Sequence, residues 1–505
     1  MKAKKVLFGN EAIQAIKKGL DLTADAVKAT IGPKGKNCFI DREMTPEMTN
    51  DGIKVAMSVT LKDHYENMGA WLVKNTSSQT NEEAGDGTTT TAVLLQSIVN
   101  ESLQRPENPM DIRNSLLETG KKIEGWIKEA TREVKDGDMK DVATISSESE
   151  SIGALISEII LKVGKDTPIR LDTNPIPEIT YEVVNGLETK VGYANPVWVT
   201  NPERQTAEYL DVPVVAVDRR ISSLMDLKPV LDSLGKAQVS SWVLLTSDID
   251  TTLLSLIAAS KTAPGGLDCM VIVVRGTELE DMASVSGATM FSETLKLKDF
   301  KLEHLGRAKK LIANDKKTII EGTNSEIQKN AVIALQARAE NTKNFYEKEQ
   351  LTKRSQALKG GIAVIKVGSP TDTERGYLID KIEDAINATK SALEEGLVEG
   401  GGMCLYRISN RIKGNSPGEE ILRKALRSPL KAIIENAGKD YTEVIKKLST
   451  KKGYDAKNDK NVDMFKLGIV DPAKVTRCAF VNALSTAATF ITSGVAVTDL
   501  EEVKK

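Results

Sequence analysis

Residues 84–90 read Ala84-Gly85-Asp86-Gly87-Thr88-Thr89-Thr90 and lie between two predicted helices, one from about Asn67 to Thr80 and an apolar one from Thr88 through Val99. Glycines let a backbone approach a phosphate closely, and the amides at a helix N-terminus stabilise its negative charge. The threonine hydroxyls add donors, and Asp86 offers the hard carboxylate oxygen that a magnesium–nucleotide complex needs. The pattern predicts a phosphate-binding loop, although a capped turn without a ligand has the same composition.

A second glycine-containing loop, Thr30-Ile31-Gly32-Pro33-Lys34-Gly35, ends a helix predicted from Asn10 to Ile31. Apolar side chains recur in that helix at three- and four-residue steps, and Gly-Pro is a natural terminator. Because the C-terminal end of a helix is negative, phosphate binding here would have to use the loop amides and the Thr30 hydroxyl. A helix stop followed by a plain turn is the alternative.

Asp384 and Asp51 are candidates for acting on a water molecule. Asp384 lies on a helix predicted from Asp372 to Leu397, on a different face from its apolar neighbours. A carboxylate there could orient or deprotonate an attacking water, or it could be an exposed helix charge. Asp51 follows Asn50 in a predicted tight turn and has the same two interpretations. The chain contains no GxxxxGK[ST] motif and no kinase signatures, so a site for ATP would fall outside those classes.

The composition limits the class of protein. A chain of 505 residues should form roughly three domains, and its 40% hydrophobic and 28% charged residues are typical of a soluble globular protein. The net charge of −2 argues against nucleic acid as the main partner, and no apolar run is long enough to span a membrane. Four scattered cysteines and two histidines do not favour a zinc site, a disulfide framework or histidine catalysis. Since nothing at the N-terminus reads as a signal peptide, a cytoplasmic location is expected.

The sequence changes character in the middle. From about Tyr181 to Lys359, short apolar runs alternate with helical patterns, which predicts an α/β domain. The runs that read as buried strands are Val212–Val217, Trp242–Thr246 and Met270–Val274. Long helical patterns then return, including one from Glu419 to Ala437 that is interrupted at Pro429. The order helical, α/β, helical predicts an inserted domain, with the two helical ends of the chain closing onto each other.

Over nearly its whole length the chain resembles the group I chaperonins, the GroEL-type family. Five stretches carry this resemblance in the family's order: the two loops quoted above, Glu66-Asn67-Met68-Gly69-Ala70, Glu394-Glu395-Gly396-Leu397-Val398-Glu399-Gly400-Gly401-Gly402 and Gly468-Ile469-Val470-Asp471-Pro472. The resemblance implies a multidomain α and α/β chain with the chaperonin fold. It would have a helical equatorial domain (residues 1–129 and 396–505), a small intermediate domain (130–184 and 362–395) and an inserted α/β apical domain (185–361). Hinges would fall near Gly186, Gly361 and Gly396.

The resemblance also implies a site for ATP. The residues that would contact ATP are Thr30, Ile31, Gly32, Pro33, Asp86, Gly87, Thr88, Thr89, Thr90, Ile145, Ser146, Gly400, Gly401, Asp455 and Asp471. Asp86 would bind Mg²⁺, and backbone carbonyls of Thr30 and Asn50 would bind K⁺. Asp384 would activate water, aided by Asp51. Because Asp384 would belong to the intermediate domain, hydrolysis would require domain closure, which couples chemistry to movement.

Two positions in this site depart from the family. Asn50 replaces a usual lysine, but only its backbone would serve, so ATP binding should survive. Asp455 stands where asparagine is usual, which would alter contacts with the base slightly.

In the apical domain the resemblance implies an apolar groove for unfolded client proteins. The residues that could form it are Tyr193, Val197, Trp198, Leu231, Leu254 and Ile257. However, Lys228, Ala258 and Ala259 stand where larger apolar side chains are common, so binding of a co-chaperonin lid is in doubt. The alternative is that these apolar residues only pack on the sheet beneath them.

The implied assembly is a homo-oligomer, a heptameric ring that is single or weakly paired into a double ring. Glu443 stands where the family places an apolar residue between rings, and an unpaired carboxylate in an interface costs free energy. A trimmed chaperonin of this kind would suit a viral genome.

The implied function is ATP-dependent folding of unfolded polypeptides, which bind at the apical rim and fold in a ring cavity through ATP-driven domain movement. A holdase or scaffold that keeps the fold without coupling ATP to folding is the alternative. The presence of Asp51, Asp86 and Asp384 together argues against that alternative.

Overall fold

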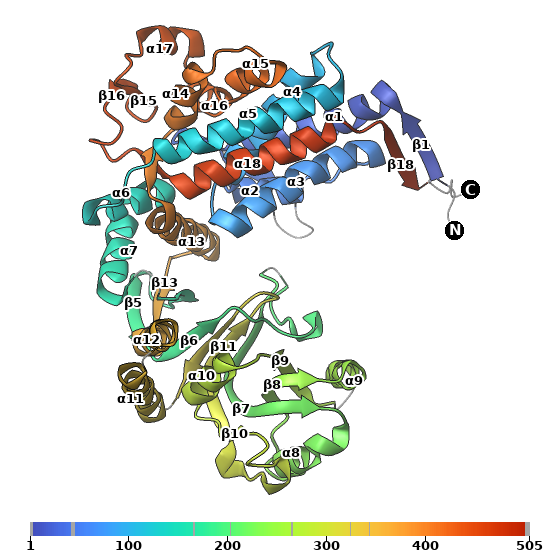
Figure 1. Ribbon diagram of the computed structural model, residues 1–505, viewed down its shortest axis with the longest axis vertical. Helices are drawn as coiled ribbons and strands as arrows, with labels where there is room; N and C mark the ends of the chain where they lie inside the picture. Colours follow the sequence, from blue (N-terminus) through green and yellow to red (C-terminus); the bar gives the residue numbers. More distant parts are fainter. Residues whose placement is uncertain are drawn as a thin grey trace. The chain divides into compact units, whose positions relative to one another are not determined.

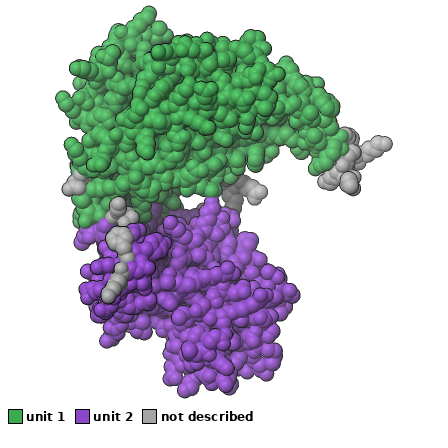
Figure 2. All heavy atoms as spheres, in the orientation of Figure 1, with its two compact units in different colours: residues 1–161, 370–505 green, residues 162–369 purple. Residues whose placement is uncertain are grey.

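The computed structural model describes residues 4–41, 46–164, 167–202, 204–263, 266–323, 325–342 and 344–499. The chain forms two compact units, one made of residues 1–161 and 370–505 and the other of residues 162–369 (Figure 2). The chain therefore leaves the first unit once and returns to it, as the helical, α/β, helical order predicts. The finer division into three domains remains a prediction.

Long helices build the core of the first unit. α1 (Gly9–Lys28) packs on α3 (His64–Ala84), and α18 (Ala473–Phe490) packs on α3, α4 (Thr88–Leu103) and α5 (Pro109–Glu129) (Figure 1). The apolar steps of α1 explain this packing, because Leu20, Ala24 and Val27 are fully buried. The predicted helix 10–31 is thus confirmed, although it ends three residues early, at Lys28.

Short antiparallel strand pairs form in the first unit, and one of them joins segments from the two ends of the chain. β1 (Lys4–Phe8) pairs with β18 (Val495–Asp499), whereas β14 (Leu397–Glu399) pairs with β17 (Val470–Pro472). The remaining elements of this unit are β2 (Cys38–Ile40), β3 (Glu47–Thr49), α2 (Gly52–Ser58), α6 (Asp136–Ser147), α13 (Asp372–Glu395), α14 (Met403–Arg411), α15 (Pro417–Ala425), α16 (Ser428–Asn436), α17 (Tyr441–Lys447), β15 (Gly453–Asp455) and β16 (Lys460–Val462). The predicted helix 419–437 is indeed interrupted, because Pro429 lies in the first turn of α16.

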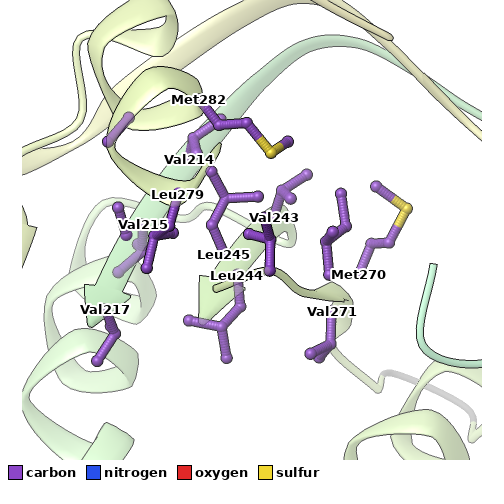
Figure 3. Packing of buried hydrophobic residues seen from close by; sticks show 14 of the residues in the cluster. Val214, Val215, Val217, Val243, Leu244, Leu245, Met270, Val271, Leu279 and Met282 are labelled. Atoms are coloured by element: carbon purple, nitrogen blue, oxygen red, sulfur yellow. The ribbon is translucent and has the colours of Figure 1, made fainter. Parts of the chain in front are cut away.

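The second unit is built on a seven-stranded sheet of order β6-β12-β11-β7-β8-β9, with β10 beside β7. These strands are β6 (Gly186–Thr189), β7 (Ala207–Ile221), β8 (Ser241–Ile249), β9 (Asp268–Val273), β10 (Met290–Phe291), β11 (Gly306–Ala313) and β12 (Thr318–Gly322). β7, β8 and β9 are parallel and contain the three predicted apolar runs, apart from Val274, which follows β9. Their valines and leucines pack with Leu279 and Met282 of α10 (Thr277–Ser286) in the core (Figure 3).

The other elements of the second unit surround this sheet or form a smaller one. α8 (Leu224–Lys236) and α9 (Thr251–Thr262) follow β7 and β8, and α11 (Ser325–Asn341) and α12 (Phe345–Gly360) pack on each other. A three-stranded sheet has the order β4-β13-β5, made of β4 (Ile169–Thr173), β13 (Ile362–Val367) and β5 (Ile179–Val184). α7 (Glu150–Val163) crosses the boundary between the units in sequence. None of the helices among the described residues is long and apolar enough to cross a membrane.

Candidate nucleotide site

A cavity of about 840 Å³ lies within the first unit. Its walls come from the loops after α1 and α3, the N-termini of α2 and α4, and parts of α6, α13 and the segment around β15 to β17. The predicted site residues that line it are Thr30, Ile31, Gly32, Pro33, Asn50, Asp51, Asp86, Gly87, Thr88, Thr89, Thr90, Ile145, Ser146, Asp384, Gly401, Asp455 and Asp471. Gly400 does not line the cavity; its backbone packs against Asp471, with an added Cβ 3.0 Å from Oδ1.

The loop at residues 85–87 needs its glycines. Gly85 and Gly87 have φ values of +71° and +87°, in the left-handed region that side chains disfavour. A Cβ on Gly87 would lie only 2.7 Å from Cγ1 of Val475. Gly87 is also the N-cap of α4, and no side chain caps that first turn. The amides at the start of α4 are therefore available for an anion, as the sequence predicts.

A second close approach joins the start of α2 to the threonines of α4. A Cβ on Gly52 would lie 2.1 Å from Oγ1 of Thr89. The Oγ1 atom of Thr89 is in turn 3.5 Å from Oγ1 of Thr30, whose hydroxyl donates to the carbonyl of Val27 at 2.9 Å. The two glycine loops of the sequence thus meet at one wall of the cavity.

The prediction of a tight turn at residues 50–52 is wrong, because these residues lead into a helix. α2 begins at Gly52, and Asp51 is its N-cap, with a carboxylate that accepts from the amide of Ile53 at 2.9 Å. The physical reason is that an aspartate before a short helix satisfies amides that the helix leaves unpaired. This capping orients the carboxylate of Asp51 at the cavity wall.

Three carboxylates from separate parts of the chain share this cavity. Burial raises the pKa of Asp384 well above its usual range, and the charges of Asp86 and Asp51 raise it further. Burial likewise raises the pKa of Asp86 and of Asp51, with Asp51 adding to the shift at Asp86. A cation placed beside these carboxylates would stabilise the ionised form of each of them.

Lys381 is one cation at this cavity that the sequence analysis missed. Its Nζ atom lies 2.8 Å from Oε1 of Glu148. Burial disfavours the charged lysine, but the hydrogen bond and charge of Glu148 outweigh burial, so the pKa of Lys381 is raised. The charge of Lys381 partly offsets the rise in the pKa of Asp86 and of Asp384. Lys381 lies one helical turn from Asp384, but this spacing predicts a residue of the site only when that face of the helix is known to meet the cavity.

At the wall formed by β17, burial and the charge of Asp86 raise the pKa of Asp471 to about 7, although the Gly401 amide donates to it. Asp455 is satisfied locally instead. Its Oδ1 accepts from the amides of Lys457 and Asn458 at 3.0 and 3.2 Å, and its Oδ2 accepts from the Asn458 side chain at 2.7 Å. Ile145 is 40% exposed on α6 and offers an apolar surface to the cavity.

The residues present fit a magnesium–nucleotide complex. Among the described residues there is no ready-made cluster of three or more His, Cys, Asp or Glu side chains for a metal ion. Mg²⁺ is commonly held by one or two carboxylates together with substrate phosphates, so Asp86 next to the uncapped helix N-terminus is a suitable donor set. The cavity of about 840 Å³ is within the usual range for a small-molecule site.

The predicted client-binding residues lie in the second unit and are buried to different degrees. Trp198 is fully buried and Ile257 is 6% exposed, both within the core. The other four, Tyr193, Val197, Leu231 and Leu254, are partly buried and pack against that core. For Trp198 and Ile257 the burial favours the alternative of packing on the sheet. Exposed apolar side chains nearby are instead Leu224 and Met225 of α8 and Leu256 of α9, with 46%, 70% and 55% exposed.

Known proteins with the same architecture can be identified by comparison of structure and of sequence. The chain is similar to chaperonin gp146 of the bacteriophage EL 2 (Pseudomonas aeruginosa), crystallised in the presence of ATP-BeFx. In one crystal form of that protein the TM-score is 0.71 at 22% identity, covering 98% of this chain and 99% of that one. A second crystal form gives a TM-score of 0.67 with the same identity and coverage. The TCP-1/cpn60 chaperonin family matches residues 23–186 and 187–497, and the chain therefore belongs to that family.

Proposed function

We propose that this chaperonin hydrolyses ATP and uses the energy to fold unfolded polypeptides. The observation that carries the proposal is the meeting of Asp51, Asp86 and Asp384 in one cavity with the uncapped N-terminus of α4. A phosphate chain needs the helix amides, and an attacking water needs a carboxylate. The phage chaperonin that this chain resembles was crystallised with an ATP analogue, which supports the same ligand.

The residues would divide the work by chemistry. Gly87 with Thr88, Thr89 and Thr90 would bind the phosphates, while Gly401, Asp455 and Asp471 would line the adenosine end. Mg²⁺ held by Asp86 would neutralise phosphate charge when bound, and K⁺ would sit at the Thr30 and Asn50 carbonyls. Asp384 would accept the proton of the attacking water, with Asp51 helping to orient that water. The presence of nucleotide-bound cations would also favour the ionised form of Asp384 that this role requires.

Coupling of hydrolysis to movement follows from where Asp384 lies in the chain. α13 begins at Asp372, directly after the boundary between the two units at residues 369 and 370. A movement of the second unit would therefore be passed to α13, as well as to α7 across the other boundary. Clients would bind apolar side chains of the second unit, and the subunits would form rings. The likeness to a bacteriophage protein supports a viral source and hence a host cytoplasm as the location.

The test is Asp384→Ala, with Glu383→Ala as the matched control. Glu383 is the exposed neighbour on the same helix, so its loss should leave hydrolysis near the wild-type rate. Asp384→Ala should still bind ATP but hydrolyse it at least about 100-fold more slowly, the usual scale for loss of a general base. Equal hydrolysis by both variants would overturn the assigned role. A wild-type protein that binds clients without hydrolysing ATP would establish the holdase alternative.

A further inference from the structure

We propose that Lys54 and Asp380 form a latch that positions Asp384 for hydrolysis, an inference that rests on the proposed function. Lys54 lies on α2 and Asp380 lies on α13. The Nζ atom of Lys54 is 2.5 Å from Oδ2 of Asp380. A second carboxylate, Glu47 on β3, is 3.8 Å from the same Nζ atom. The contact joins two elements that are 326 residues apart in sequence.

The latch lies next to both carboxylates assigned to the attacking water. Lys54 follows Asp51 by three residues, and Asp380 precedes Asp384 by four. Residues three or four apart on a helix lie on the same face. Asp380 and Asp384 are thus one turn apart on α13, and Lys54 lies in the first turn of α2, the helix that Asp51 caps. The ion pair therefore joins the two elements that position these carboxylates.

The burial of the pair gives it more weight than an ordinary surface contact. The side chains of Lys54 and Asp380 are 36% and 26% exposed, and attraction between charges strengthens as water is excluded. Burial alone would lower the pKa of Lys54, but the hydrogen bond and charge of Asp380 outweigh it and raise that pKa. Lys54 therefore carries its positive charge at neutral pH in this contact.

Other contacts of α13 hold its C-terminal half and show where along the helix the latch acts. Toward its C-terminal end, Asn387 packs on Gly85, and the Ser391 hydroxyl donates to the carbonyl of Ala84 at 2.7 Å. These contacts hold that half of the helix on the phosphate loop. In the N-terminal half, which follows the boundary between the units, Lys381 pairs with Glu148 at the end of α6 and Asp380 pairs with Lys54, so the latch is a contact that ties this half to α2. Without the tie to α2, the spacing between Asp384 and Asp51 would be less constrained, and small misplacements of a catalytic group are costly.

Four variants test the latch: Lys54→Met, Asp380→Asn, the double variant and Lys54→Arg. Each single neutral variant should lower kcat for ATP about tenfold while KM stays within about threefold, because positioning and not binding is lost. The double variant should be no slower than the slower single one, since both remove one interaction. Lys54→Arg keeps the charge and should restore most of the rate.

The matched control breaks another ion pair of the same helix. Lys474 of α18 lies 2.6 Å from Glu394, at the opposite end of α13. Lys474→Met and Glu394→Gln should leave kcat unchanged. If these controls slow hydrolysis as much as the latch variants do, or if the latch variants hydrolyse ATP at the wild-type rate, the latch is refuted.

Hydrogen–deuterium exchange gives a readout that does not depend on hydrolysis. In nucleotide-free Lys54→Met and Asp380→Asn, amides of residues 372–383 should exchange faster than in the wild type, whereas residues 384–395 should change little. Unchanged exchange in residues 372–383 would overturn the latch. If the wild type does not hydrolyse ATP, the proposed function fails, and this exchange pattern still decides whether the latch exists.

Discussion

Gly85 and Asn387 are in direct contact: a Cβ atom added to Gly85 would lie 2.4 Å from Cβ of Asn387. Gly85 caps the C-terminus of α3 and opens the loop at residues 85–87, and Asn387 lies on α13, three residues after Asp384. The helix that carries Asp384 thus packs closely against the loop that would hold the phosphates. This contact by itself explains why residue 85 is a glycine, whether or not a ligand binds.

Gly85→Ala should therefore damage both stability and hydrolysis. The left-handed backbone at φ +71° disfavours a side chain, and the near atom of Asn387 is not at the end of a flexible chain. The expected loss is about 2–4 kcal/mol, with a matching fall in ATPase rate. Gly376→Ala on α13 is the control, because nothing lies within 4 Å of its added Cβ. It should stabilise the helix by about 0.5–1 kcal/mol. Similar thermal midpoints for the two variants would contradict this account.

Arg170→Met should destabilise the second unit much more than Arg307→Met. Arg170 pairs with Glu321 at 3.0 Å, and their side chains are only 6% and 4% exposed. Removing the arginine leaves Glu321 buried, with Lys309 as its remaining ion-pair partner among the residues that the structure describes, at an expected cost of about 2–4 kcal/mol. Arg307 pairs with Asp211 on the surface, where both side chains are more than half exposed, so its loss should cost about 0–1 kcal/mol. Urea unfolding followed by intrinsic fluorescence measures the difference, and equal costs would refute the burial argument.

Asp471→Asn should make the nucleotide-free protein less sensitive to pH. Burial raises the folded-state pKa of Asp471 to about 7, whereas an unfolded aspartate titrates near about 4. Because the folded state binds this proton more tightly than the unfolded state does, protonation of Asp471 stabilises the fold. This stabilisation is complete below about pH 4 and is lost as the pH rises through about 7. The wild type should therefore lose stability between pH 5 and 8, and the variant should lose less. Thermal midpoints across this range test the prediction, which fails if both proteins lose the same amount.

Glu443→Val should strengthen pairing between rings, if the assembly is the proposed one. Glu443 lies exposed in the first turn of α17, whose N-cap is Asp440, so its side chain is free to meet a partner surface. A carboxylate at an interface must lose water, and an apolar side chain need not. Native mass spectrometry with and without ATP should show single rings of the wild type and more double rings of the variant. A wild type that stays a double ring in every nucleotide state would contradict the prediction.

Local patterns in the sequence predict much of this fold. The apolar runs at residues 212–217 and 242–246 are strands in the core, because such short β-branched runs suit a parallel sheet covered on both faces. The break at Pro429 and the left-handed glycines of the phosphate loop are likewise local properties. The resemblance to chaperonins, carried by five such stretches, is confirmed at the level of the family.

Contacts between distant segments could not be predicted in the same way. Lys381 was missed because its place in the site depends on an ion pair with Glu148, 233 residues away, and on which face of α13 meets the cavity. Trp198 lies in a short apolar run that does not reveal whether it faces solvent or the sheet, and the structure buries it fully. Gly400 belongs to a glycine run in which position alone does not distinguish a lining residue from one that packs on Asp471.

The most direct test of the central claim is the refolding of a chemically denatured enzyme, with ATP and without any added co-chaperonin. Wild-type protein should give a clear gain in active enzyme that requires ATP. Asp384→Ala should suppress aggregation of the client without that gain, because it would bind ATP but not complete the cycle. Equal yields with the two proteins, or an equal yield without ATP, would contradict the claim that ATP hydrolysis at this cavity drives folding.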